Sequence, residues 1–409
     1  MKRFSWLSSG KLRVSYGFTG NNDIGNYTAI STIGTTSYAF GGALANGRSI
    51  TVLGNEDLRW EKTGEFNAGL DLSFLRDRIS FTADVYRRIT QNMLYQLPLA
   101  LSSGFSTAYA NIGKIQNQGL ELAVVTRNIT GRDLTWTTSA NIAFNRNKVL
   151  ALANGVTALY NGQTGNGQYS HITKVGKPMG LFWGWVYQGI YATQDDFDKS
   201  PKNASSVLGS IKYKDVDGNG VIEYQKDFDI IGNPHPDFTY GITNNFSYRN
   251  IDLSVVLVGS QGGQVEKAQN QYLLNIDGIF NPDKKVLNRW RSVTQPGDGK
   301  TPTTNGGRVL YRDLNSTWIE NASYLRIQNV TLGYNFSPRL LRSTHFVKNL
   351  RAYVSVQELA MFTSYSGNNP EATRRTLRPN AQNEAQIPGE DFGNYPLSRT
   401  CTVGLNVTF

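Results

Sequence analysis

The feature that most constrains the fold is a two-residue hydrophobic alternation, which is clearest at the C-terminus. In the final segment "CTVGLNVTF", one parity holds only apolar residues: Cys401, Val403, Leu405, Val407 and Phe409. Successive side chains of a β-strand point to opposite faces, so this pattern predicts a strand with one apolar and one polar face. The sequence ends on an aromatic residue within this strand, whereas most termini are poorly ordered.

The same alternation recurs along most of the chain. The segments "EFNAGLDLSF" (65–74) and "ISFTADVY" (79–86) each alternate, and the polar turn Arg76-Asp77-Arg78 joins them into a predicted hairpin. Further alternating segments lie at 134–145, 238–248, 251–258, 330–336 and 350–357. We predict about ten to twelve antiparallel strands. The first lies at 11–18, and a helix is expected within a long loop at 264–275.

Two architectures accommodate such strands: a β-sandwich or soluble barrel with one face on a core, and a membrane barrel with its apolar face toward lipid. Strands of about ten residues tilted by about 40° span roughly 25 Å, the height of the apolar band of a membrane barrel. Aromatic residues near the ends of the alternating segments are typical of an interfacial girdle; they are Phe66, Phe74, Trp136, Phe144, Phe238 and Tyr248. Short connections alternate with long polar stretches, the short ones at 76–78, 131–133 and 249–250 and the long ones at 90–113, 153–180, 192–236, 263–322 and 359–398. This asymmetry favours the membrane barrel.

Composition argues against several other classes of protein. The sequence is 39% apolar, and no window approaches the roughly 18 consecutive apolar residues of a transmembrane helix. The formal charge of +10 is spread over single Lys and Arg residues, so nucleic-acid binding is not expected. No Gly-x-Ser-x-Gly, His-Glu-x-x-His or phosphate-loop motif occurs, so we do not expect an enzyme.

Six motifs resemble those of SusC/RagA-type TonB-dependent outer-membrane transporters of Bacteroidetes-like bacteria. They are "KLRVSYGFTGNN" (11–22), "NEDLRWEKTGEFNAGLDLSFL" (55–75), "NIGKIQNQGLEL" (111–122), "GNPHPDFTYGITNNFSY" (232–248), "SYLRIQNVTLGYNF" (323–336) and "YSGNNPE" (365–371). The motifs follow the family's order and cover nearly the whole chain, so residues 1–409 resemble the C-terminal part of one barrel without a plug domain. The resemblance implies an all-β fold, an antiparallel transmembrane β-barrel with long extracellular loops.

The resemblance also implies a function, a location and partners. Members of this family import glycan or peptide fragments through the outer membrane of Gram-negative bacteria, with a SusD-like lipoprotein over the long loops and energy from the TonB system. Their terminal strand lies among outer-membrane lipids and is the signal read by the barrel assembly machinery, which assigns that role here to Val403, Leu405, Val407 and Phe409. The alternative is a surface-exposed adhesin or carbohydrate-binding β protein without transport.

The resemblance does not extend to the family's signal sequence, TonB-contacting segment, plug domain or N-terminal barrel strands. An open half-barrel leaves about ten unpaired backbone groups on each edge, at several kcal/mol each in lipid. The summed cost far exceeds a typical total stability of about 5–15 kcal/mol. We therefore expect a truncated or split product that alone neither inserts stably nor transports.

The strongest local motif is the acidic segment "YKDVDGNGVIEYQKDFDIIGNP" (213–234). Oxygen-bearing residues at alternate positions followed by Gly220 match the first half of a calcium loop, and a backbone carbonyl and a carboxylate follow at the next ligand positions. The ligand set is Asp215, Asp217, Asn219, Val221 and Glu223. The twelfth position is Lys226 where an acidic ligand is expected, so a bulge would have to bring in Asp227. The alternative is a metal-free turn rich in Asp, Asn and Gly.

Aromatic residues of one parity stand out in "LFWGWVYQGIY" (181–191). Trp183 and Trp185 are candidate substrate contacts, because exposed aromatic residues in extracellular loops stack on sugar rings or cap peptide side chains. The pattern itself favours the alternative, a lipid-facing or girdle strand.

Overall fold

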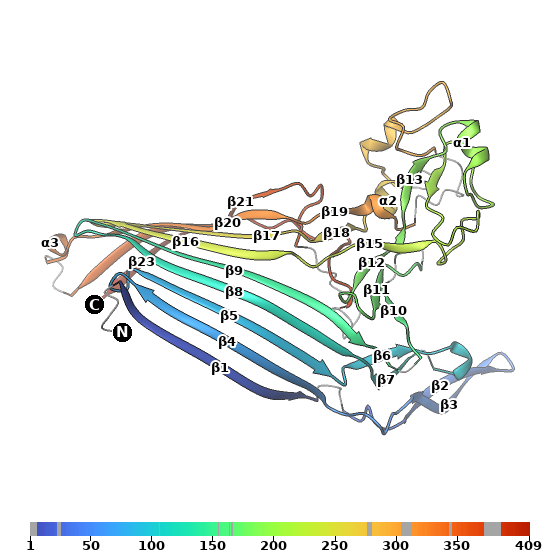
Figure 1. Cartoon of the computed structure of the whole chain (residues 1–409), viewed down its shortest axis with the longest axis horizontal. Coiled ribbons are helices and arrows are strands. Elements are labelled where there is room, and N and C mark those ends of the chain that lie inside the picture. Colours follow the sequence, from blue (N-terminus) through green and yellow to red (C-terminus); the bar gives the residue numbers. More distant parts are fainter. Residues whose placement is uncertain are drawn as a thin grey trace.

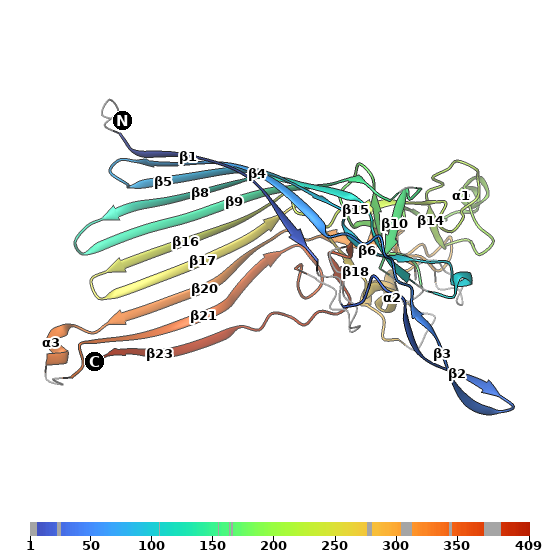
Figure 2. The same ribbon diagram turned by 90° about the horizontal axis from the view of Figure 1, so that it is seen from below.

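The computed structural model describes residues 6–22, 26–105, 107–153, 155–162, 164, 167–275, 280–303, 313–342, 346–371 and 386–409. Its largest element is a ten-stranded sheet in which every neighbouring pair is antiparallel. In spatial order the strands are β1 (Leu7–Asn21), β4 (Glu61–Phe74), β5 (Ile79–Gln91), β8 (Lys114–Thr130), β9 (Leu134–Ala151), β16 (Phe238–Tyr248), β17 (Ile251–Gln261), β20 (Tyr324–Asn335), β21 (Asn349–Thr363) and β23 (Thr400–Thr408). The strands follow chain order and form a curved sheet (Figure 2).

The connections are short at one end of the sheet and long at the other. The tight turns between β4 and β5, β8 and β9, and β16 and β17 lie at the same end as helix α3 (Pro338–Leu341) and the C-terminus (Figure 1). Leu75, Arg76 and Asp77 all have positive φ angles (53°, 59° and 62°), so three consecutive left-handed residues close the first of these turns. The predicted alternation of short and long connections is therefore confirmed.

The long connections hold smaller elements of their own at the opposite end (Figure 1). Their strands are β2 (Thr32–Phe40), β3 (Ala43–Val52), β6 (Leu94–Pro98), β7 (Thr107–Asn111), β10 (Ala158–Asn161), β11 (His171–Lys174), β12 (Leu181–Trp185), β13 (Tyr187–Ile190), β14 (Ile211–Tyr213), β15 (Phe228–Gly232), β18 (Gln264–Lys267), β19 (Ile319–Asn321) and β22 (Glu390–Asp391). The helices are α1 (Gln194–Lys199) and α2 (Asn270–Leu273), with short 3₁₀ turns η1 (Leu101–Ser103), η2 (Lys284–Asn288) and η4 (Ser316–Trp318). Among the described residues, no helix is long and apolar enough to cross a membrane.

The register of strand pairing places the apolar side chains of neighbouring strands on the same face of the sheet. Val85 pairs with Leu120, and Leu120 pairs in turn with Phe144. Val85 is 53% exposed and Leu332 is 52% exposed, so this face does not pack against a core as it would in a sandwich. The apolar face is therefore the surface that meets lipid.

The opposite face is polar and carries ion pairs. Arg13 donates hydrogen bonds to Asp71 at 2.8 Å and to Asp84 at 3.0 Å, which links β1, β4 and β5. Asp252 accepts hydrogen bonds from Arg351 across β17, β20 and β21. Charged groups of this kind belong on the water-filled side of a membrane barrel.

Two details differ from the sequence-based expectation. The helix predicted over 264–275 is wrong in extent: Gln264–Lys267 form strand β18, paired with β19, and only Asn270–Leu273 are helical. Val265 is fully buried, which the strand geometry explains better than a helical face. The hairpin of β2 and β3 was also missed, and it projects away from the rest of the molecule (Figure 1).

The orientation of the two faces predicts a difference between neighbouring residues in the middle of β8. Leu122→Arg would place a charge on the lipid-facing side and is expected to destabilise the protein by about 2–4 kcal/mol, whereas Ala123→Arg would point to the polar side and cost less than about 1 kcal/mol. Urea unfolding of the protein in outer-membrane vesicles of its host, followed by the heat-dependent migration of the folded band, measures both. Equal losses for the two variants would contradict the assignment of the faces.

Candidate functional site

The acidic segment forms a compact turn between β14 and β15. Asp215 accepts hydrogen bonds from the backbone N–H groups of Gly218 and Gly220, both at 2.7 Å. These two glycines have positive φ angles (74° and 82°), which allow the chain to fold back around the carboxylate. The sequence therefore predicts the local shape of the turn correctly.

Asp227 closes the turn from its other end. Its side chain is completely buried, and it accepts hydrogen bonds from the backbone N–H groups of Val216 and Glu223, both at 2.7 Å. Asp215, Asp217 and Asp227 each offer a carboxylate oxygen within 4.8 Å of the other two. The structure thus brings Asp227 beside the first ligand positions, although it lies one residue beyond the usual twelfth position.

The remaining predicted ligands are held differently. Glu223 accepts two hydrogen bonds from the ammonium group of Lys226, at 2.8 and 3.0 Å, and this contact lowers the pKa of Glu223. Asn219 donates to both Asp217 and Glu223 and accepts from the N–H of Val221. The N–H groups of Gly220 and Gly218 lower the pKa of Asp215, so this carboxylate is ionised at neutral pH.

The chemistry of this donor set suits a hard cation such as Ca²⁺, which binds carboxylate and carbonyl oxygens. Asp215, Asp217 and Asp227 supply a preassembled negative centre. Recruitment of Glu223 would require it to leave Lys226. Lys226, at the expected position of the acidic ligand, acts instead as a partial internal counter-charge.

The candidate aromatic residues lie away from lipid, in a small core beside the acidic turn. Trp185 is 1% exposed, stacks on Tyr213 with ring centroids 4.7 Å apart and meets Phe228 edge-on at 4.6 Å. The expected lipid-facing or girdle strand is therefore wrong for this segment, because β12 belongs to a loop sheet with β10, β11 and β15. Trp183 is partly buried against the same cluster, so neither indole is an open stacking platform.

A second polar cluster was missed by sequence reasoning. His171, Glu266 and Glu390 are all buried and offer ligand-type atoms within 4.8 Å of one another. Parallel pairing of β18 with β22 places Glu266 opposite Glu390, and His171 Nε2 lies 3.0 Å from the carbonyl oxygen of Pro388. The cluster joins three long connections, and no local sequence motif could indicate it because its members are far apart in the chain.

Three of the predicted assembly-signal residues lie on β23, at one edge of the sheet, and Phe409 follows directly after this strand. Val403, Leu405, Val407 and Phe409 are 78%, 67%, 41% and 69% exposed. β23 pairs with β21, and Phe409 stacks on Phe346 with ring centroids 6.2 Å apart. Their position on the lipid-facing side agrees with the predicted parity, while their role in assembly stays a prediction.

Comparison with known proteins places these features in a family context. A family model described as TonB dependent receptor-like, beta-barrel matches residues 3–359. TonB-dependent receptor P3 of Formosa agariphila is 33% identical over the whole chain, which covers 40% of that protein. TonB-dependent receptor SusC of Bacteroides thetaiotaomicron is 29% identical over the whole chain, which covers 38% of that protein.

A solved structure shows the same arrangement. A chain of the structure described as the RagAB peptide transporter superimposes with a TM-score of 0.82 at 25% identity, over the whole of this chain and 41% of that one. The chain thus spans about 40% of the length of the relatives it matches.

The packing of the loop core predicts a local effect of removing its central indole. Trp185→Ala is expected to destabilise the core around the acidic turn by about 3–5 kcal/mol, because the side chain is fully buried between two aromatic rings. Limited proteolysis of the folded protein should then show new cleavage within 192–236 while the ten-stranded sheet keeps its folded migration. Trp60→Ala removes the same side chain from a 65% exposed position and serves as the control; similar cleavage in both variants would contradict the assignment.

Proposed function

Because the chain belongs to the family of TonB-dependent receptor-like β-barrels, we propose that it supplies the barrel portion of an outer-membrane transporter that imports glycan or peptide fragments. The observation that carries this proposal is the division of one antiparallel sheet into an apolar and a charged face, with all long connections at one end. A lumen lined by charged and polar side chains suits passage of hydrated solutes.

The ion pairs of the polar face support a wide, hydrated lumen. Arg13, Asp71 and Asp84 are each about one-fifth to one-third exposed and point away from lipid. Charges at membrane depth are tolerated where they face a water-filled space and pair with one another. A dry barrel interior would not accommodate this set, so the polar face is suited to a solute path.

We propose that the long connections form the extracellular mouth, where a SusD-like lipoprotein would cover the substrate, and that TonB supplies the energy. The description of RagAB as a peptide transporter supports the peptide class, and the name of SusC supports a TonB-dependent receptor. They favour transport over the adhesin alternative and support a non-enzymatic role in a Gram-negative, Bacteroidetes-like outer membrane. The terminal strand β23 would be the segment recognised by the barrel assembly machinery.

Deletion of the gene in its host is expected to abolish growth on one class of glycan or peptide fragments as the sole carbon source, because a dedicated transporter is lost. Uptake of fluorescently labelled fragments of both classes measures the defect directly, and the complementing wild-type gene should restore it. Unchanged uptake of every fragment together with loss of surface attachment would instead support the adhesin.

We also propose that the acidic turn binds Ca²⁺ through Asp215, Asp217 and Asp227, with Asn219, Val221 and Glu223 as further oxygen donors. The support is the approach of three carboxylates within 4.8 Å, in a turn whose ends are fixed by the core around Trp185. Bound calcium would neutralise these charges and stiffen the connection between β14 and β15. A metal-free turn remains the competing hypothesis, because Lys226 already offsets part of the charge.

Calcium should raise the melting temperature of the protein, monitored by tryptophan fluorescence, and Asp215→Asn should remove that shift. At a calcium concentration about 100 times the dissociation constant, the stabilisation is about 2.7 kcal/mol. Asp195→Asn removes one carboxylate from α1 of the same connection and is the control, since Asp195 is exposed and pairs with Lys199. An equal calcium shift in Asp215→Asn and wild type would contradict the site.

The pH dependence of the same melting curve gives a further readout of Asp215. Its pKa is lowered in the folded turn, so it binds protons less readily there than in the unfolded chain. Its contribution to stability is therefore complete above the ordinary value of 3.8 and is lost as the pH falls through the lower folded value. Asp215→Asn should therefore reduce the decrease in melting temperature at acidic pH.

A further inference from the structure

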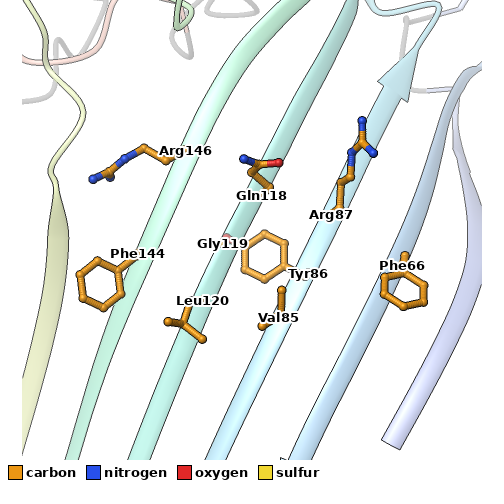
Figure 3. A pocket seen from close by; sticks show the side chains of 9 residues that line it. All are labelled: Phe66, Val85, Tyr86, Arg87, Gln118, Gly119, Leu120, Phe144 and Arg146. Carbon is orange, nitrogen blue, oxygen red and sulfur yellow. The ribbon is translucent and has the colours of Figure 1, made fainter.

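Cationic side chains interrupt the apolar face at its loop end. Arg87 of β5 and Arg146 of β9 have the same parity as Val85 and Phe144, so they point to the lipid-facing side. In Figure 3, Arg146, Gln118 and Arg87 lie across three neighbouring strands, and Phe144, Leu120, Val85 and Phe66 form a second row nearer the short turns. These residues line a hollow of about 480 Å³.

The depth of this cationic row follows from the cost of charge in lipid. An arginine on the outer face of a barrel is strongly destabilising at the bilayer midplane but is tolerated near the interface. Phe144 contacts Phe238 with ring centroids 5.6 Å apart, which gives an aromatic girdle directly beside the row. Arg87 and Arg146 therefore lie at the level of the lipid headgroups on the side of the long loops.

The guanidinium group of Arg87 has no oppositely charged partner among the described residues. Arg87 donates two hydrogen bonds to the amide oxygen of Gln116, at 3.0 and 2.8 Å, but forms no ion pair among the described residues. By contrast, Arg88, on the polar face, pairs with Glu65 at 2.8 Å. Arg146 contacts the exposed carboxylate of Asp237 at 3.3 Å.

A third cation extends the row. A neighbouring hollow of about 470 Å³ shares Phe66 and Arg87 with the first and adds Lys62, whose ammonium lies 4.2 Å from the ring centroid of Phe18. Positive charge thus spans β4, β5 and β9, with aromatic rings beside it. This surface is complementary to a ligand with anionic oxygens at one end and apolar chains at the other.

We propose that this surface binds one phosphorylated lipid of the outer leaflet. Arg87 and Arg146 donate hydrogen bonds to the phosphate oxygens of its headgroup, as guanidinium groups do to phosphate in pairs of parallel bonds. The row of Phe66, Val85, Leu120 and Phe144 packs against its acyl chains. Arg87 and Arg146 stand two strand spacings apart, about 10 Å, which suits a headgroup rather than a single inorganic ion.

The inference depends on the membrane-facing side of the barrel and is independent of which solute the lumen carries. Its test uses the protein extracted in detergent from the outer membrane of its host. Native mass spectrometry would measure binding of diphosphorylated lipid A, of the same lipid after phosphatase treatment, and of inorganic phosphate. Wild type should bind the phosphorylated lipid at least tenfold more tightly than the dephosphorylated one, and inorganic phosphate should not compete.

The double variant Arg87→Gln/Arg146→Gln should weaken binding of the phosphorylated lipid by roughly a hundredfold, because each lost charge-assisted contact is worth about tenfold or more. Arg127→Gln/Arg249→Gln removes the same charge near the short turns and should bind as wild type does. Arg87→Lys/Arg146→Lys keeps the charge and should retain part of the affinity.

Equal affinity of wild type for the phosphorylated and dephosphorylated lipids would overturn the proposal and leave an apolar contact only. Competition by inorganic phosphate would identify a free-anion site and would also overturn it. Both of these comparisons need only wild-type protein, so a folding defect in the variants does not affect them. If the two double Gln variants weakened lipid binding equally, net charge alone would explain the effect. That result would contradict a site at this position.

Discussion

The structure depends on one constraint: within a bilayer, every backbone N–H and C=O group must find its partner inside the protein. Ten strands in an antiparallel ladder meet this requirement along their shared edges. Because the ladder uses the backbone, side chains alone decide which face meets lipid and which meets water. Leu122 and Ala123 are neighbours in sequence and lie on opposite sides of the same wall. The hydrophobic alternation of the whole chain follows from this division.

The long connections solve a different problem, because they lie in water and bury a core of their own. Trp185 packs between Tyr213 and Phe228, which border the acidic turn on either side. Elsewhere, His171, Glu266 and Glu390 bring three connections to one point. The long connections therefore form a packed structure at one end of the sheet, with aromatic contacts beside the acidic turn.

The kind of charged side chain changes with position along the strands. The middle of the polar face carries compensated pairs such as Arg13 with Asp71 and Asp84. Above the aromatic girdle, the lipid-facing side carries Arg87 and Arg146, whereas the connections beyond it carry the acidic turn. The proposed lipid site and the proposed calcium site therefore lie at different positions along the barrel.

Much of this protein was determined by its sequence alone, because strand parity and tight turns are local properties. The alternating segments, the turn Arg76-Asp77-Arg78 and the Gly-rich bend after Asp215 all lie where the sequence predicts them. Burial of Trp185 and convergence of the two glutamates with His171 were decided only by tertiary structure. Their partners lie far away in the chain. The same alternation of aromatic residues is therefore compatible with a lipid-facing strand and with a buried core of a loop. Only the register between strands determines which side chains meet, and it is not encoded in any single segment.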